Sequence, residues 1–214
     1  HDEIEAITKA ARKGKRPIVL SLSPGPAPVE NIKHLQSVAQ LWRISEDFWD
    51  NWEALKEQFP LCRKWQKYIC KGHWPDADML PIGPMAQRAM RGTPRMSNFT
   101  PDEQYTMLTL WAMFRSPLMI GCNLPEIDDF TLNLITNKEV LDINQYSKGN
   151  KELFDRNGII AWYAQSEDEL THYIAIFNTT DKDIESYTFP LQTINYIGDG
   201  HITDLWKNES MEIK

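Results

Sequence analysis

The sequence predicts an α/β fold: the second half of a (β/α)8 barrel over residues 1–147, followed by part of an antiparallel β-sandwich over residues 148–214. In the first region, four apolar runs each precede a segment with helical periodicity, which is typical of parallel strand–helix units. In the second region, short strand patterns alternate with polar turns. Four strand–helix units would leave open sheet edges, so a complete barrel needs another half.

The first two units are expected within residues 2–59. A helix is predicted from Asp2, a favoured N-cap residue with Glu5 three positions on, and apolar Ile4, Ile7 and Ala11 follow on one face. The run 17–23 is continuously apolar and stops at the proline- and glycine-rich residues 24–28, as a buried strand would. The remaining elements of this part are a helix over residues 32–39, a short strand over 41–45 and a helix over 48–59.

The third and fourth units are expected within residues 79–141. The apolar runs 79–83 and 117–124 predict strands, separated by a loop over 84–99. Thr100, Pro101 and Glu103 form a strong helix-start signal, since Thr caps, Pro suits the first helical position and Glu follows three after the cap. Further predicted elements are helices over 101–115 and 129–141, and strands over 159–165, 171–178, 186–189 and 201–206.

Charge and composition exclude several classes of partner and cofactor. The net charge of −7 and the lack of a long basic run argue against nucleic acid and anionic membranes. No apolar stretch approaches the roughly 20 residues that span a bilayer. Cys62, Cys70 and Cys122 are too few and too irregularly spaced for a zinc site or a disulfide scaffold, although a Cys62–Cys70 pair stays open. We expect neither a cofactor nor a metal.

Two segments combine tryptophans with acids, residues 42–52 and 72–80. Aromatic rings suit the apolar C–H face of a sugar, and carboxylates suit its hydroxyl rim. Trp42 and Trp74 are the tryptophans placed where a sugar could stack, whereas the others could be core residues. In a barrel, the functional face lies at the carboxyl ends of the strands, where many of these acids are expected. The segments therefore indicate a carbohydrate site.

Asp47 is the candidate proton donor of this site. It lies among Glu46, Phe48 and Trp49, where partial desolvation of its carboxyl would favour the protonated form that a general acid needs. The alternative is that Asp47 caps the helix that begins near Phe48, because Asp is a favoured N-cap residue. Composition alone favours the capping role.

Arg43, Asp76 and Asp78 are the other polar candidates. The fork of Arg43 suits a bidentate contact with adjacent hydroxyls, or else an ion pair with Glu46 or Asp78. On an extended segment Asp76 and Asp78 would point the same way and grip neighbouring sugar hydroxyls, while Asp76 could instead cap a turn. With His73, the two aspartates would also suit a zinc or calcium site, although no matching cluster exists elsewhere.

Five ordered segments in residues 1–150 carry a resemblance to a known family. Together they resemble glycoside hydrolase family 27, the α-galactosidase and α-N-acetylgalactosaminidase family. The segments are Trp-Arg-x-x-x-Asp-x-x-Asp-x-Trp from Trp42, Gly-x-Trp-x-Asp-x-Asp-Met-Leu-x-x-Gly from Gly72, residues 103–112, Ser-Pro-Leu-Met-Ile-Gly from Ser116 and Asp-Ile-Asn-Gln from Asp142.

The resemblance implies a retaining double displacement without a cofactor, acting on a small carbohydrate. It assigns the acid/base role to Asp47, contacts with sugar hydroxyls to Arg43 and Asp78, and the lining of the pocket to Trp74 and Met79. The family's nucleophile belongs to a Lys-x-Asp motif that this chain lacks, so we expect it upstream of residue 1. The remaining N-terminal half of the barrel is then an implied partner, and the chain alone is expected to be inactive.

The substrate stays open because one position departs from the family pattern. Ser23 falls at or near a Glu that reads the C-2 substituent, which leaves room for a bulkier group. The alternatives are α-N-acetylgalactosaminides, β-L-arabinopyranosides, α-glucans, or a non-catalytic carbohydrate-binding protein on a decayed barrel. The resemblance further implies a secreted or periplasmic protein, and self-association as a homo-oligomer stays open.

Overall fold

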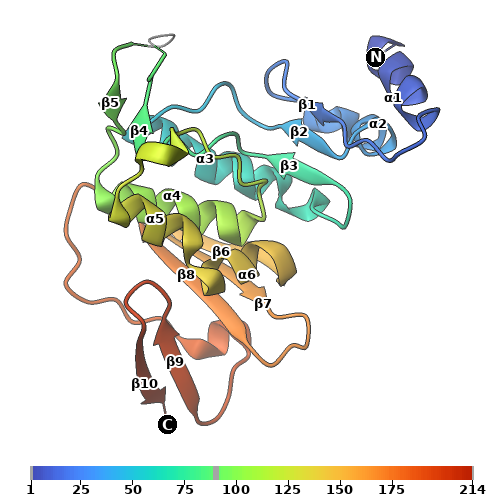
Figure 1. The fold of residues 1–214 in the computed structure, drawn as a ribbon. Coiled ribbons are helices and arrows are strands. Elements are labelled where there is room, and N and C mark those ends of the chain that lie inside the picture. Colours follow the sequence, from blue (N-terminus) through green and yellow to red (C-terminus); the bar gives the residue numbers. More distant parts are fainter. Residues whose placement is uncertain (1, 89–91, 214) are drawn as a thin grey trace.

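The computed structural model describes residues 2–88 and 92–213 (Figure 1). Its first part alternates helices with the strands of a parallel sheet, whose order is β1-β2-β3. The elements of this part are α1 (Asp2–Arg12), β1 (Ser21–Leu22), α2 (Ile32–Val38), β2 (Leu41–Arg43), α3 (Trp52–Trp65) and β3 (Trp74–Asp76). Short 3-10 turns lie at Val29–Asn31, Gln66–Tyr68, Leu124–Glu126 and Leu191–Ile194.

The middle of the chain is mainly helical. Its elements are the hairpin β4 (Pro84–Met85) and β5 (Arg95–Met96), followed by α4 (Pro101–Phe114), α5 (Asp129–Thr136) and α6 (Lys138–Tyr146). The predicted capping box is confirmed, since Thr100 Oγ1 accepts from Glu103 N and Glu103 accepts from Thr100 N. The single helix predicted over 129–141 is two helices, because Asn137 leaves the helical conformation and caps α6.

The last part is antiparallel. One sheet contains β6 (Lys148–Arg156), β7 (Ile159–Gln165) and β8 (His172–Asn178), and a hairpin contains β9 (Gly200–Asp204) and β10 (Glu209–Ile213). The prediction of β7, β8 and β9 is confirmed, but β6 and β10 were not predicted. The predicted strand at 186–189 is wrong, since these residues lie outside any ladder of the described chain. Figure 1 shows the parallel sheet and the β9–β10 hairpin at opposite ends, with α4 to α6 between them.

The barrel strands are shorter than predicted, and the third is displaced. It lies at Trp74–Asp76, before the apolar run 79–83, because the backbone turns at Asp78, where φ is 80°. Beyond this turn Leu80 forms only an isolated parallel bridge to Ile120, which is all that remains of the strand predicted over 117–124. The sheet thus continues in order from β1 to the segment around Ile120, although its last pairing is a single bridge.

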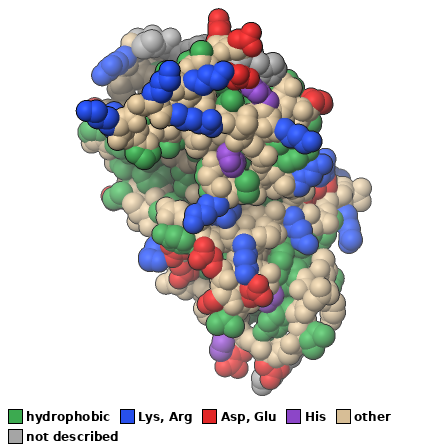
Figure 2. Space-filling model, turned by 90° about the vertical axis from the view of Figure 1, so that its right-hand side faces the viewer, with side chains coloured by type: hydrophobic (Ala, Val, Ile, Leu, Met, Phe, Trp, Pro, Cys, Tyr) green, Lys and Arg blue, Asp and Glu red, His purple; other side chains and the backbone are tan. Residues whose placement is uncertain are grey.

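Apolar side chains are exposed at both edges of this sheet. Ile18 and Val19 are 52% and 67% exposed beside β1, and Met119 and Ile120 are 47% and 42% exposed at the other edge. No other described segment pairs with the outer side of β1. Figure 2 shows apolar side chains between charged ones on one face of the molecule. On the predicted apolar face of α1, Ile4 and Ala11 are half-buried but Ile7 is exposed, and the buried residue of that helix is Thr8.

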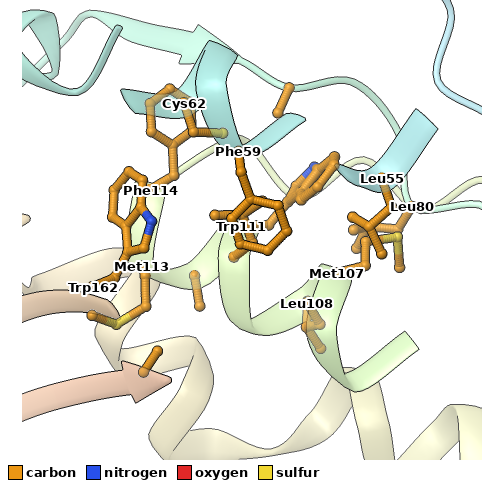
Figure 3. Close-up of a cluster of buried hydrophobic side chains, with 14 of the residues drawn as sticks. Leu55, Phe59, Cys62, Leu80, Met107, Leu108, Trp111, Met113, Phe114 and Trp162 are labelled. Carbon is orange, nitrogen blue, oxygen red and sulfur yellow. The ribbon is translucent and has the colours of Figure 1, made fainter. Parts of the chain in front are cut away.

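The core lies between α3 and α4 and extends to β7 (Figure 3). Phe59 and Cys62 of α3 face Trp111 and Phe114 of α4, and the rings of Phe114 and Trp162 meet edge to edge at 6.2 Å. All five side chains are at most 2% exposed. Cys62 is buried here, Cys70 is exposed, and both are free thiols, so the pairing left open by the sequence does not occur.

Arg115 joins the end of α4 to the end of α6. It has a left-handed backbone with φ of 58°, and its guanidinium donates to the carbonyl oxygens of Asn144, Gln145 and Ser147 at 2.6–2.8 Å. The guanidinium also lies over the ring of Trp74, 4.7 Å from its centroid. One side chain therefore satisfies the carbonyls of Asn144 and Gln145, which the end of α6 leaves without internal partners, and that of the C-cap residue Ser147.

Replacing Arg115 by alanine should lower the free energy of unfolding by about 3 kcal/mol, because three charge-assisted hydrogen bonds are lost together. Arg115→Gly should lose roughly 1 kcal/mol less, since glycine tolerates the left-handed backbone. Chemical denaturation of the intact protein measures both. Arg156→Ala, at an arginine that lies over Phe154, is the matched control and should cost much less. Equal losses at the two arginines would contradict this role.

Candidate functional site

The site lies where three parallel strands end. In the register of the sheet, Leu22 pairs with Trp42, and Arg43 pairs with Asp76. Ser23 follows β1 at the level of Arg43 and is exposed. The loop after β1 is fixed to the end of β2, since Ala27 N donates to Arg43 O at 2.8 Å. The carboxyl ends of neighbouring strands thus bring Ser23, Arg43 and Asp76 to one edge.

Arg43 is the centre of this group. Its side chain is 7% exposed, and Nη1 forms an ion pair with Asp78 Oδ1 at 2.9 Å. Nη2 donates to Ser45 O at 3.2 Å and lies 3.5 Å from Asp47 Oδ1. The Nε atom is buried without a hydrogen-bond partner among the described residues. The ion pair with Asp78, one of two partners that the sequence left open, is therefore formed.

Asp78 is held by three contacts from different elements. Its Oδ1 pairs with Arg43, and its Oδ2 accepts from Phe48 N at 2.7 Å. Its carbonyl oxygen accepts from Trp111 Nε1 at 2.9 Å. The side chain is 15% exposed, and the backbone has a positive φ that is uncommon outside glycine. These contacts fix the carboxylate at the edge of the site and join the loop after β3 to the loop after β2.

Asp47 does not cap a helix. The helix of this unit, α3, begins at Trp52, and Asn51 is its N-cap, with Oδ1 accepting from Ala54 N at 3.1 Å. The Asp47 side chain is 65% exposed beside Arg43, so the partial desolvation expected from its neighbours is not found in this chain. The structure leaves Asp47 as an accessible carboxylate on the loop that follows β2.

The side chain of Asp76 caps the turn between β3 and Asp78. Its Oδ1 accepts from Asp78 N at 2.9 Å, so the two aspartates do not point the same way along an extended segment. Asp76 is 4% exposed, and burial raises the pKa of its carboxyl above the ordinary value despite that hydrogen bond. The turn-capping alternative is confirmed, and a direct grip of Asp76 on sugar hydroxyls is not supported.

The metal alternative is also wrong for the described residues. Among them, no group of three His, Cys, Asp or Glu side chains could hold a metal ion. His73 Nδ1 lies 3.1 Å from the carbonyl oxygen of Ala39, at the start of the sheet, and Asp76 and Asp78 are engaged as described.

The two tryptophans proposed for stacking lie elsewhere. Trp42 is completely buried and packs on Trp65, so it offers no face to a sugar. Trp74 is the first residue of β3, in register with Leu41, and therefore lies at the opposite end of the strand from Asp76. Met79, in contrast, lies beside Asp78 and lines a cavity. The structure thus brings together Arg43, Asp47, Asp78 and Met79, with Ser23 at the same edge.

Asp50 is a residue of this region whose role was not predicted. Its carboxylate, 3% exposed, accepts from Arg95 Nη1 and Nη2 at 2.5 and 2.9 Å and from Asn98 N at 2.5 Å. Burial alone would raise the pKa of Asp50, but the bonds from Arg95 and Asn98 outweigh it and hold the pKa below the ordinary 3.8. The sequence could have singled out Asp50 as the second Asp of the Trp-Arg-x-x-x-Asp-x-x-Asp motif, although the motif does not indicate its partner. Asp50 ties the hairpin β4–β5 to the loop that carries Asp47.

Asp50→Asn should lower the free energy of unfolding by about 2 kcal/mol at pH 7, through loss of the charge in this contact. Because the folded-state pKa of Asp50 is lowered, its contribution is present above the unfolded-state pKa and disappears as the pH falls through the folded value. The difference between the two proteins should therefore shrink between pH 5 and pH 3 (about one unit either side of the ordinary pKa). Denaturation at both pH values measures this, and an unchanged difference would contradict it.

Comparison with known proteins agrees with the resemblance. The family model of alpha galactosidase A matches residues 2–146. Alpha-galactosidase 2 of Arabidopsis thaliana is 31% identical over 112 residues, which cover 52% of this chain and 25% of that protein. The alpha-galactosidase of Cyamopsis tetragonoloba is 30% identical over 129 residues, covering 59% and 28%.

A solved structure matches the whole chain. The GH27 β-L-arabinopyranosidase of Geobacillus stearothermophilus is 42% identical with a TM-score of 0.93, covering 100% of this chain and 49% of that enzyme. The chain thus shares the fold of about half of that enzyme and spans about a quarter of its curated relatives. No described helix is long and apolar enough to cross a membrane. The chain belongs to the alpha galactosidase A family, glycoside hydrolase family 27.

Proposed function

We propose that the intact protein is a retaining glycosidase that acts on terminal α-galactosides or related sugars, with Asp47 as general acid/base. The observation that carries this proposal is the group around Arg43, which pairs with Asp78 at 2.9 Å and lies 3.5 Å from Asp47. A buried cation thereby holds one carboxylate fixed and keeps another, accessible carboxylate beside it. The fixed pair suits hydrogen bonding to sugar hydroxyls, and the double displacement of the family assigns proton transfer to the accessible Asp47 beside it.

The proposed reaction has two displacements. In the first, an aspartate from the N-terminal part of the intact protein attacks the anomeric carbon, the bond to the leaving oxygen breaks, and Asp47 gives that oxygen its proton. In the second, Asp47 takes a proton from water, and the water oxygen attacks the anomeric carbon and releases the aspartate. Asp78 and Arg43 orient the sugar, and Met79 lines the pocket beside it.

A β-L-arabinopyranoside is the second candidate substrate. It is supported by the 42% identity to the arabinopyranosidase over the whole chain, compared with about 30% over half of it for the galactosidases. Ser23, small and exposed at the edge of the site, adds α-N-acetylgalactosaminides as a third class to test. Hydrolysis of the three aryl glycosides by the intact protein decides among them. Release from none of the three nor from an aryl α-glucoside, with retained sugar binding, would show a carbohydrate-binding protein instead.

We further infer that the antiparallel region after α6 is part of a β-sandwich and that the sheet edges at Val19 and Ile120 pair with the N-terminal half of the barrel. Exposure of apolar side chains at both edges supports the second inference.

Secretion or periplasmic location is proposed from family membership alone. Fractionation of cells that express the intact protein tests it, and recovery only inside the cytoplasm would contradict it.

A further inference from the structure

The indole of Trp111 joins the core to the turn that carries Asp78. Trp111 lies in α4 and is completely buried (Figure 3). Its Nε1 atom donates to the carbonyl oxygen of Asp78 at 2.9 Å. Its own carbonyl oxygen accepts from Ser116 N at 3.0 Å and from Asn144 Nδ2 at 3.3 Å. The backbone behind the indole is therefore anchored to the segment after α4 and to α6, and the indole extends from this anchor to Asp78.

This hydrogen bond is not a general property of the buried tryptophans. Trp42 and Trp162 are equally buried, at 0% exposed, and their Nε1 atoms have no hydrogen-bond partner among the residues that the structure describes. A buried indole N–H usually finds a partner. Here the partner exists where the indole faces the turn after β3. The bond thus depends on the position of Asp78 and not on burial alone.

The backbone of Asp78 needs support because of its conformation. Its φ of 80° lies in the left-handed region, which is uncommon outside glycine and persists where the surrounding contacts hold it. Asp78 N donates to Asp76 Oδ1 at 2.9 Å, and the carbonyl oxygen accepts from Trp111. Both backbone polar groups are thus held by side chains, one from β3 and one from α4. With the backbone held in this way, the carboxylate meets Arg43 Nη1 at 2.9 Å.

Trp111 supports the carboxylate of Asp78 by a second route, through Phe48. The rings of Trp111 and Phe48 pack with their centroids 5.0 Å apart, and Phe48 is 1% exposed. Phe48 N donates to Asp78 Oδ2 at 2.7 Å. Since Phe48 directly follows Asp47, the same indole also packs behind the loop that carries the proposed acid/base. One core side chain therefore contacts both segments of the proposed site.

We propose that Trp111 is a positioning residue for the glycosidase reaction: buried out of reach of a substrate, it holds the carboxylate of Asp78 where a sugar hydroxyl binds. The inference rests on the proposed function, in which Asp78 and Arg43 orient the sugar. Because Asp78 contacts the sugar and not the leaving group, loss of this support lowers the rate by the same factor for good and poor leaving groups. The loss expected for Asp47 is, in contrast, largest for poor leaving groups.

Trp111→Phe in the intact protein keeps a buried ring and removes the N–H. It should lower kcat/KM for aryl glycosides by about 10- to 100-fold, equally across a series of leaving groups, since misplacement by about 1 Å can cost about 100-fold. Trp162→Phe is the matched control, because its equally buried N–H has no partner among the described residues. It should lower the free energy of unfolding but leave kcat/KM close to that of the wild type.

Two further measurements separate positioning from a general loss of packing. In an Asp78→Ala background the carboxylate is absent, so Trp111→Phe should add little to the loss of activity, whereas independent effects would multiply. Asp78→Asn gives the same comparison with a milder change. Binding of the released monosaccharide, measured by calorimetry, should weaken for Trp111→Phe and not for Trp162→Phe. Phe48→Leu, which removes only the second route, should show the pattern of Trp111→Phe with a smaller loss.

Equal kcat/KM for Trp111→Phe and Trp162→Phe, or losses that multiply in the double variant, would overturn the inference. A loss confined to poor leaving groups would do so as well, because it would show an effect on Asp47 and not on Asp78. Failure of the wild type to cleave any aryl glycoside of the candidate sugars would instead overturn the proposed function. The two failures are therefore distinguishable.

Discussion

Asp47→Asn in the intact protein should lower kcat/KM by about 10²- to 10⁴-fold for glycosides with poor leaving groups. Aryl glycosides with acidic leaving groups should lose much less in the first displacement, because their oxygen departs without a proton. Asparagine preserves the shape and a contact with Arg43, so the loss reports the missing proton. Steady-state and pre-steady-state rates for a series of leaving groups measure the effect.

Rescue of an Asp47 variant by a small anion is the complementary test of the acid/base role. Asp47→Ala leaves space beside Arg43, and added azide should accelerate turnover of the glycosyl-enzyme and yield a glycosyl azide of retained configuration. Glu46→Gln, at the neighbouring exposed acid, is the matched control and should change the rates by less than about twofold. Equal losses for good and poor leaving groups, without azide rescue, would show that Asp47 is not the acid/base.

Asp78→Ala should affect both activity and stability. It leaves the guanidinium of Arg43, 7% exposed, without its closest charge partner and removes the acceptor of Phe48 N. Breaking such a buried pair from one side typically costs about 3–5 kcal/mol. Asp78→Asn retains an acceptor for Phe48 N and should cost less. Denaturation of the intact protein, together with kcat and KM, measures the two effects.

A double variant separates the two roles of this pair. Adding Arg43→Met to Asp78→Ala removes the unpaired buried charge, so stability should recover in part while activity stays low. Glu57→Gln, at an exposed acid of α3, is the control and should leave both unchanged. Wild-type stability in Asp78→Ala would contradict the anchoring role, and wild-type activity in the double variant would contradict the sugar-binding role.

The elements that the sequence predicted well depend on local signals. The capping box at Thr100 fixed the start of α4 to the residue, and the short apolar run between polar turns at residues 159–165 gave β7 with the same bounds as in the structure. The third barrel strand failed because the apolar run after Asp78 is buried core without being a regular strand. An apolar run has the same hydrophobicity whether it forms a strand or an irregular buried segment. The strand ends before this run because the backbone turns at Asp78, where φ is positive.

The residues of the candidate site likewise include some that the sequence placed correctly and some that it did not. The ion pair of Arg43 with Asp78 was one of two that the sequence left open, and the resemblance assigned both residues to sugar hydroxyls; the end of a strand did not predict it, because the third strand was expected after Asp78. The predicted positions of Trp42 and Trp74 at the sugar site were wrong. Periodicity leaves the ends of a short strand uncertain by a few residues, so it does not show which end of the strand a residue occupies. The contact of Asp50 with Arg95 spans 45 residues and a hairpin predicted as a loop, so no local signal gave it.

The configuration of the sugar released first tests the account most directly. Proton NMR of the intact protein, acting on an aryl glycoside in deuterated buffer, records which anomer forms before mutarotation. A double displacement through an upstream nucleophile and Asp47 predicts the same anomeric configuration as in the substrate. First formation of the inverted anomer would require a single displacement by water and would contradict the proposed double displacement, in which Asp47 acts first as acid and then as base.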